Sequence, residues 1–276
     1  MASHLVVVTV AEEAVEEVSG DLWGAGVIGI EERSAGDGWV QLRAGLAGGA
    51  DPGAVTAVLD GRWAVAVELV EGEEWLDTWQ AHAATTDVGQ RLRVHPVWLP
   101  QSLPQPDRVE ILLPPHRAFG TGAHPTTTMV LEQLEMSVVE GMDVLDVGCG
   151  AGLLAVAAAR LGAARVVAID VDAEAVRATA ATARVNRVED VVEVSDVPLA
   201  QVRGRFDLVL ANIGLGVLVD LLPDLAMRLA PSGALVLSGV LEPQADELLA
   251  SASQSGLVAV ELVARGGWAA LVMQHR

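Results

Sequence analysis

Lysine is absent from this chain of 276 residues, so all 17 of its basic side chains are arginines. Acidic residues number 37, which gives a formal net charge of −20. This balance excludes a protein that wraps nucleic acid, because binding to phosphates needs a cationic face. It also disfavours binding to anionic membranes, whereas a basic partner would be attracted.

Cysteine is nearly absent as well. Cys149 cannot form an internal disulfide, and no Cys/His cluster has the spacing of a metal site, so we expect no bound metal. The first residues lack the basic region that opens a signal peptide. The apolar run 151–159 ends at Arg160, far short of the about 20 residues that span a bilayer. These absences predict a cytoplasmic protein without a membrane partner.

The length predicts about two domains, at about 100 to 200 residues for each. In residues 1–70, short β-branched runs and two stretches of helical spacing follow one another in the order β-α-β-β-α-β, which is that of ferredoxin-like α+β domains. We expect this domain to recognise a substrate rather than to carry chemistry. Its predicted strands are 5–10, 26–31, 39–42 and 63–70, and its predicted helices are 12–22 and 51–59.

Residues 71–85 form the predicted linker between the domains. Trp75 and Trp79 are four residues apart and share one helical face, which predicts a linker helix. The simpler interpretation is that both indoles anchor this helix against a domain, and a hinge is the alternative. Two further strands, 91–98 and 108–113, are expected on either side of a proline-rich loop.

The remainder of the chain alternates between apolar runs and helical segments. Continuous apolar strands separated by helices predict a mostly parallel sheet that is covered on both faces. We therefore expect an α/β fold with a doubly wound, seven-stranded sheet in a domain over 86–276, which ends in an antiparallel hairpin. The predicted strands are 143–147, 165–169, 191–194, 206–211, 234–237, 257–263 and 268–273, with helices that include 153–161 and 173–186.

A glycine-rich segment connects the first of these strands to its helix. Gly148, Gly150 and Gly152 follow Asp146, and Asp170 ends the next strand. Glycines in such a turn let a ligand approach the backbone, and an acid at the next strand end can accept hydrogen bonds from a ribose diol. The pattern predicts a nucleoside site, with a plain tight turn as the alternative. The spacing differs from the G-x-G-x-x-G of dinucleotide-binding proteins, which argues against NAD.

The sequence D-x-G-C-G-x-G, followed by Asp170 and by a strand that leads into Asn212, resembles the class I methyltransferases that use S-adenosylmethionine. The segment 118–127, A-F-G-T-G-A-H-P-T-T, is similar more narrowly to the ribosomal large-subunit protein methyltransferases of the PrmA type, and the likeness extends over the whole chain. The resemblance implies S-adenosylmethionine as the cofactor. It places cofactor contacts at Thr127, Gly148, Asp170 and Asn212, beside Asp146 and Gly150, and a covering loop at Phe119, Gly120, Thr121 and Gly122.

Thr127 and Asn212 also have local sequence features of their own. Thr127 follows Pro125, which stands at a predicted first helical position, and the hydroxyl groups in this first turn suit the helix start to a polar ligand. The alternative is that residues 126–128 are only a capping cluster. Asn212 lies past a core strand, where its amide can donate and accept, or it ties down a turn. No general base is evident, because Asp146 is expected to position the cofactor, Cys149 has no basic neighbour and His124 is expected to brace the loop.

The resemblance implies methyl transfer to lysine ε-amino groups, with the N-terminal α-amino group as a further candidate, of the basic stalk-base ribosomal protein, number eleven of the large subunit. The expected mechanism is in-line attack by a neutral amine. Residues 1–70 would grip that protein, without direct nucleic-acid contact, and we expect a monomer. Gly214 and Gly216 depart from the family pattern, which leaves open the methylation of another protein or of a small amine. A cofactor-binding module without activity is the second alternative.

Overall fold

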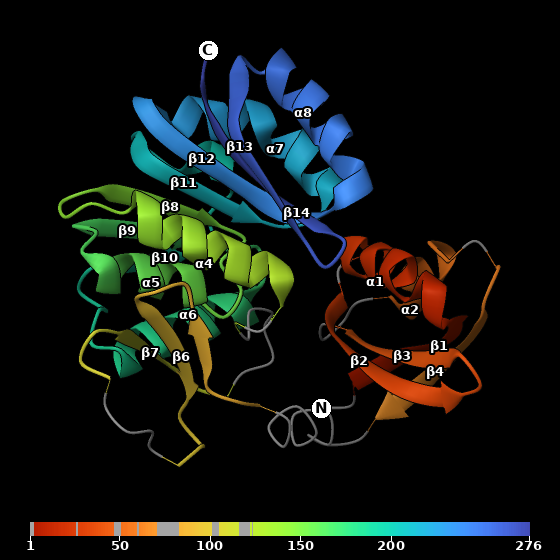
Figure 1. Cartoon of the computed structure of the whole chain (residues 1–276). Helices are drawn as coiled ribbons and strands as arrows, with labels where there is room; N and C mark the ends of the chain where they lie inside the picture. The colour runs from red at the N-terminus through yellow and green to blue at the C-terminus, as the bar shows by residue number, and fades with distance from the viewer. Residues whose placement is uncertain are drawn as a thin grey trace. The chain divides into compact units, whose positions relative to one another are not determined.

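Figure 1 shows the computed structural model of the chain. It describes residues 3–25, 27–46, 51–59, 61–70, 83–100, 105–115, 122 and 124–276. The chain divides into two compact units, Met1–Ala81 and His82–Arg276.

The first unit contains a four-stranded antiparallel sheet with the strand order β2-β3-β1-β4. Alternate residues of β1, among them Val6 and Val8, are fully buried against Val18 and Leu22 of α1. The predicted order β-α-β-β-α-β is confirmed. The elements are β1 (Ser3–Ala11), a 3-10 turn (Glu12–Ala14), α1 (Val15–Gly24), β2 (Val27–Gly36), β3 (Trp39–Leu46), α2 (Pro52–Ala57) and β4 (Ala64–Val70).

The second unit is built on a seven-stranded sheet with the strand order β10-β9-β8-β11-β12-β14-β13. The first five strands in this order run parallel, and β14 is antiparallel to both of its neighbours. This confirms the predicted mostly parallel sheet with a terminal hairpin. The strands are β8 (Asp143–Val147), β9 (Arg165–Ile169), β10 (Val192–Ser195), β11 (Phe206–Asn212), β12 (Leu229–Leu241), β13 (Leu257–Arg265) and β14 (Trp268–His275).

Helices cover both faces of this sheet (Figure 1). One buried core lies beneath α4, α5 and α6, and a second lies beneath α7 and α8 on the opposite face. The helices are α4 (Pro125–Ser137), α5 (Leu153–Leu161), α6 (Ala173–Val185), α7 (Leu215–Arg228) and α8 (Ala245–Gln254), with 3-10 turns at Leu199–Gln201 and Glu242–Gln244. None of the helices in the described ranges is long and apolar enough to span a membrane.

A three-stranded sheet precedes α4 and consists of β5 (Thr86–Val88), β6 (Leu92–Pro96) and β7 (Val109–Leu113). Its buried side chains, which include Val94 and Ile111, join the core beneath α4 and α5. The sequence predicted β6 and β7 but not β5. A strand of three residues is too short to show an alternating pattern.

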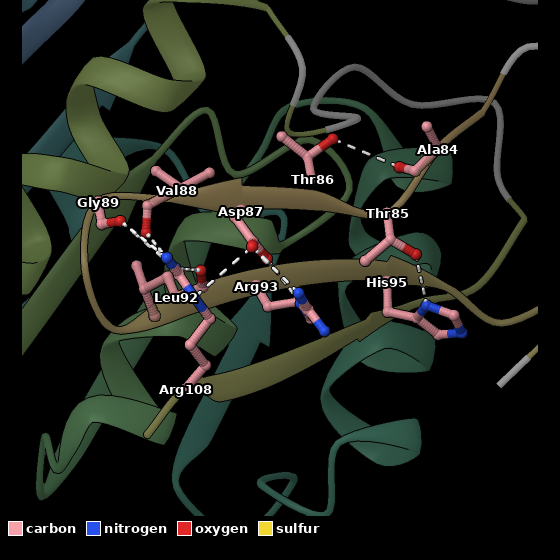
Figure 2. A network of polar contacts seen from close by, with 10 residues as sticks. All are labelled: Ala84, Thr85, Thr86, Asp87, Val88, Gly89, Leu92, Arg93, His95 and Arg108. Carbon is pink, nitrogen blue, oxygen red and sulfur yellow. Dashed lines mark hydrogen bonds and ion pairs between the residues drawn. The ribbon is translucent and has the colours of Figure 1, made fainter. Parts of the chain in front are cut away.

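Polar contacts hold this small sheet together (Figure 2). Arg108 donates to the carbonyl oxygen of Leu92 at 2.7 Å and to that of Gly89 at 3.3 Å. Asp87 accepts two hydrogen bonds from Arg93, at 2.6 and 3.0 Å, and lies 3.6 Å from Arg108. The hydrogen bond from Arg93 holds the pKa of the Asp87 carboxyl below its usual range, with the charge of Arg108 adding to the effect. The network thereby fixes the turn between β5 and β6.

The start of β12 differs from the prediction, and the predicted linker helix is not described by the structure. Strand β12 begins at Leu229, earlier than the predicted 234–237, because Gly233 lets it pass close to β11: a Cβ there would lie 2.9 Å from the carbonyl oxygens of Phe206 and Asp207. The predicted linker helix with Trp75 and Trp79 lies outside the described residues, apart from residues 83–85, which are not helical.

Candidate active site

The predicted site residues meet at the carboxyl ends of three neighbouring strands. β8 lies between β9 and β11. After β8 the chain adds β9 and β10 on one side of it, and the next strand, β11, is added on the other side, so the strand order reverses direction at β8. Open α/β sheets bind ligands at such a switch in strand order. Asp146 is the penultimate residue of β8, Asn212 is the last residue of β11, and Asp170 directly follows β9.

The glycine loop turns tightly between β8 and α5. The backbone N–H groups of Gly148 and Cys149 both donate to the carbonyl oxygen of Ile169, at 2.9 and 3.1 Å. Gly152 has a φ of 79°, and a Cβ there would lie 2.8 Å from the Cα atom of Thr179 on α6. The turn therefore requires glycine at position 152. The two hydrogen bonds to Ile169 tie the loop to the end of β9.

Asp170 is half-buried and held by the backbone on both sides. Its Oδ2 atom accepts from the N–H of Gly150 at 2.9 Å, and its Oδ1 atom accepts from that of Asp172 at 3.0 Å. Asp172 caps α6 by accepting from the N–H of Glu174 at 2.8 Å. The orientation of the Asp170 carboxylate is thus fixed, and its remaining lone pairs can accept further hydrogen bonds.

Asp146 is fully buried and only half satisfied. Its Oδ2 atom accepts from the N–H of Ala155, in the first turn of α5, at 3.1 Å. Its Oδ1 atom is buried and has no hydrogen-bond partner among the described residues. Burial raises the pKa of the Asp146 carboxyl to about 7, and the charge of Asp170 adds to the increase.

The three threonines at the start of α4 differ in their contacts. Thr126 Oγ1 lies 2.8 Å from Nδ1 of His124, and Thr128 donates to the carbonyl oxygen of Pro125 at 2.8 Å. The hydroxyl oxygen of Thr127 is buried without a partner in the described part of the chain. Both interpretations of 126–128 therefore apply, to different residues: Thr126 and Thr128 make local capping contacts, and Thr127 does not. Pro125 is the first residue of α4, as predicted.

Strands β8 and β11 and helix α4 bring three buried oxygens that have no described partner to one face of the sheet. Leu208 and Leu210 of β11 belong to the core beneath α4 and α5, so Asn212, two residues further on, faces the same way. Asp146 is opposite Leu210 in the β8–β11 register and shares this face, which α4 covers with Thr127. The Oδ1 atom of Asn212, like Oδ1 of Asp146 and Oγ1 of Thr127, is buried without a described partner. A buried unpaired polar atom costs about 1–3 kcal/mol, so this set indicates a polar ligand site.

The other titratable groups at the site stay neutral. Burial raises the pKa of the Cys149 thiol, as does the charge of Asp146, which argues against a nucleophilic cysteine. Burial lowers the pKa of His124 to about 4. Its ring packs edge-on against the ring of Trp268, with 4.8 Å between the ring centroids. His124 also caps α4 by accepting from the N–H of Thr126 at 3.4 Å. No group of three or more potential metal ligands occurs in the described ranges.

Some expected residues lie outside the described structure, and two that sequence reasoning missed lie at the site. Phe119, Gly120 and Thr121 are not among the described residues. Val171, directly after Asp170, is 91% exposed although it is apolar. Ile213, directly after Asn212, contacts the glycine loop at Gly148. An apolar residue after each strand-end polar residue was the available sequence signal.

The set of groups fits S-adenosylmethionine. Two carboxylates, an amide oxygen and a hydroxyl suit a ligand with a ribose diol, an ammonium group and a positive sulfonium, because all four can accept hydrogen bonds or attract positive charge. The loop beside them has a positive φ at Gly148, Gly150 and Gly152, and its glycines place no side chains along this stretch of backbone.

Comparisons with known proteins agree with this fit. The family described as ribosomal protein L11 methyltransferase (PrmA) matches residues 53–276. A protein of that name from Geotalea daltonii is 41% identical over 217 residues, which cover 75% of this chain and 69% of the relative. Another, from Methylococcus capsulatus, is 37% identical over an alignment of 291 residues, which covers 98% of each chain. The crystal structure of ribosomal protein L11 methylase from Lactobacillus delbrueckii subsp. bulgaricus matches with a TM-score of 0.65 and 30% identity, covering 70% of this chain and 98% of that one.

The fold and the site together define a class I methyltransferase, an enzyme that takes its methyl group from S-adenosylmethionine. The predicted fold class and cofactor are confirmed. Within this class, the chain belongs to the ribosomal protein L11 methyltransferase (PrmA) family, as its resemblance to that family implied.

Proposed function

We propose that this protein transfers methyl groups from S-adenosylmethionine to lysine ε-amino groups of ribosomal protein L11, with the N-terminal α-amino group as a further acceptor. The family match over residues 53–276 and the names of the relatives support this substrate. The observation that carries the proposal is the set of three buried oxygens, on Thr127, Asp146 and Asn212, that gather on one face of the sheet beside the glycine loop.

Thr127, Gly148, Asp170 and Asn212 are the proposed cofactor contacts. Asp170, which the backbone already orients, would accept from the ribose hydroxyls, and Asp146 and Gly150 would line the loop beside the methionine end. Exposed Val171 offers an apolar surface for the flat base. Phe119, Gly120 and Thr121 are proposed to cover the cofactor. When bound, S-adenosylmethionine supplies an electrophilic methyl group on a positive sulfonium.

The chain would contribute alignment rather than proton transfer. A lysine amine has an ordinary pKa of about 10.4 and must be neutral to attack, but neither Cys149 nor His124 offers a base. Nδ1 of His124 already accepts a hydrogen bond from the backbone of Thr126. We therefore propose that the acceptor amine loses its proton to solvent, and that Oδ1 of Asn212 accepts an N–H from the neutral amine and orients its lone pair.

The test is to incubate the protein with S-adenosylmethionine and purified L11 and to map methylated residues by mass spectrometry. Because the chain contains no lysine, it contributes no lysine methylation of its own to the spectrum. We expect methylated lysines in L11 with the wild type, and loss of the product with Asp170→Ala. Asp172→Ala is the matched control, since it removes a neighbouring carboxylate that only caps α6.

Incubating the protein with a whole-cell extract and S-adenosylmethionine that carries a labelled methyl group distinguishes the alternatives. Label in another protein, or in a small amine, would replace L11 as the substrate. Binding of the cofactor in calorimetry, without transfer to any component of the extract, would indicate a binding module without activity. Either outcome contradicts the proposed substrate.

Partner and location follow from the same proposal. A net charge of −20 suits a basic protein partner and disfavours direct contact with nucleic acid or an anionic membrane. We propose that residues 1–70 grip the ribosomal protein, that residues 71–85 link them to a catalytic domain over 86–276, and that the enzyme acts as a cytoplasmic monomer.

A further inference from the structure

We infer that Ile213 is a positioning residue that holds the cofactor loop and Asn212 at a fixed separation. This inference rests on the proposed function, because it takes Asn212 to face the acceptor amine. Ile213 lies directly after Asn212, between β11 and α7, and it contacts both β12 and the loop that follows β8.

The side chain of Ile213 contacts the glycine loop. A Cβ atom placed on Gly148 would lie 2.5 Å from Cγ2 of Ile213. Apart from the residues next to Gly148 in the chain, the Ile213 side chain is all that lies within 4 Å of this point in the described structure. The Cγ2 methyl group therefore occupies the space in which a side chain at position 148 would stand.

The backbone of Ile213 is held from the other side by β12. Gly239 has a φ of 87°, and a Cβ atom there would lie 2.6 Å from the carbonyl oxygen of Ile213 and 2.8 Å from its N and C atoms. The N–H of Ile213 donates to the carbonyl oxygen of Ser238 at 3.1 Å. The β12–β14 register shifts between Ser238 and Val240, so Gly239 sits at a bulge that faces Ile213.

These contacts connect donor and acceptor through one residue. The Gly148 loop is the proposed seat of the methyl donor, and Asn212 is bonded covalently to Ile213. In-line displacement requires the reacting atoms to be aligned, and a misplacement of about 1 Å can slow a reaction by about a hundredfold. Because Cγ2 is attached to Cβ, its position depends on χ1 alone, which is restricted in β-branched residues. A β-branched side chain is thus suited to set this distance.

Two variants separate positioning from packing. Ile213→Leu keeps the number of carbon atoms but has no methyl group on Cβ, whereas Ile213→Val keeps both branches at Cβ and loses only the terminal methyl group. With L11 and S-adenosylmethionine, we expect Ile213→Leu to lower kcat by about tenfold or more, with little change in either KM. Ile213→Val should retain kcat within about twofold. If the two variants lose kcat equally, or if Ile213→Val loses more, Ile213 acts only by filling space.

Methyl NMR supplies a readout that does not depend on turnover. With isoleucine labelled at Cγ2, the resonance of Ile213 is identified by its absence from the Ile213→Val protein. We expect a nuclear Overhauser effect to the α protons of Gly148 in the cofactor-free wild type, and a shift of this resonance on titration with S-adenosylhomocysteine. A missing effect, or an unmoved resonance while calorimetry shows binding, would overturn the inference. Failure of the proposed function has a different signature, in which the contact to Gly148 is present but L11 is not methylated.

Discussion

The two carboxylate oxygens of Asp146 differ in their surroundings. Its Oδ2 atom holds the first turn of α5 through Ala155, while its Oδ1 atom is buried without a partner in the described structure. Such an atom lowers the stability of the free protein and is available to a ligand. The pKa of about 7 follows from burial, since water cannot stabilise the charge.

The raised pKa of Asp146 makes the stability of the cofactor-free protein depend on pH. Between the ordinary value of 3.8 and about 7, the folded state keeps a proton that the unfolded state releases. The contribution of this carboxyl to stability is therefore full below pH about 4 and is lost as the pH rises to about 7. Urea unfolding should show the stability of the wild type falling relative to Asp146→Asn from pH about 5 to about 7, by at most about 1.4 kcal/mol for each pH unit. Parallel curves for the two proteins would contradict a raised pKa.

Gly152 provides a second test at the residue scale. Gly152→Ala should destabilise the protein, because the added Cβ would lie 2.8 Å from the Cα atom of Thr179 and the φ of 79° disfavours alanine. Gly204→Ala is the matched control, since Gly204 has a φ of 93° but no described atom within 4 Å of the added Cβ. The control should lose about 1–2 kcal/mol from the backbone conformation alone. In urea unfolding, Gly152→Ala should lose clearly more, and equal losses would show that the loop can move away from α6.

Helix α4 begins at a cap that also orders the site. His124 accepts from the N–H of Thr126, and its ring packs against Trp268 of β14. Thr127 is the third residue of α4, so the cap at His124 fixes the first helical turn, which carries the Thr127 hydroxyl. The predicted bracing role of His124 is consistent with these contacts.

Replacing His124 separates the cap from the ring contact. His124→Ala should lose about 1 kcal/mol for the cap, and the packing against Trp268 in addition. His124→Asn can still accept from the N–H of Thr126, so it should recover most of the capping part. Urea unfolding at neutral pH measures both. The same loss in the two variants would mean that the ring contact, and not the cap, stabilises this end of α4.

Elements whose signals are local could be predicted from the sequence. Strands β8 and β9 and helix α5 have the predicted bounds, because short apolar runs there end at glycine or charged residues. The start of β12 and the whole of β5 could not, because tertiary contacts define them: Gly233 packs on β11, and Arg108 holds the turn after β5.

The same division applies to the site. Asp146, Asp170 and Asn212 could be predicted as candidates because each lies at or beside the end of a strand in a recognisable motif, and sheet topology brings such ends together. Ile213 was missed: its place after Asn212 marks it only as an apolar residue, whereas its contacts with Gly148 and Gly239 arise from segments that approach β11 in space.

At the scale of the whole molecule, the charge of −20 should govern how a basic acceptor arrives. Attraction between opposite charges raises association rates and is screened by salt. We expect kcat/KM for L11 to fall as ionic strength rises from about 0.01 to about 0.15 M, where the screening length shortens from about 30 to about 8 Å. The value of kcat at saturating L11 should change little, since alignment within the site is short-range. A kcat/KM that is unchanged or rises with salt would show that charge does not guide the acceptor.

The most direct measurement is a crystal structure of the protein with S-adenosylhomocysteine. We predict that the ligand lies at the carboxyl ends of β8, β9 and β11, with its ribose hydroxyls on Asp170, its amino-acid end against the Gly148 loop, and Thr127 and Asn212 within hydrogen-bonding distance. A ligand bound elsewhere, or one that leaves the buried oxygens of Thr127, Asp146 and Asn212 without contact, would contradict the assignment of this site.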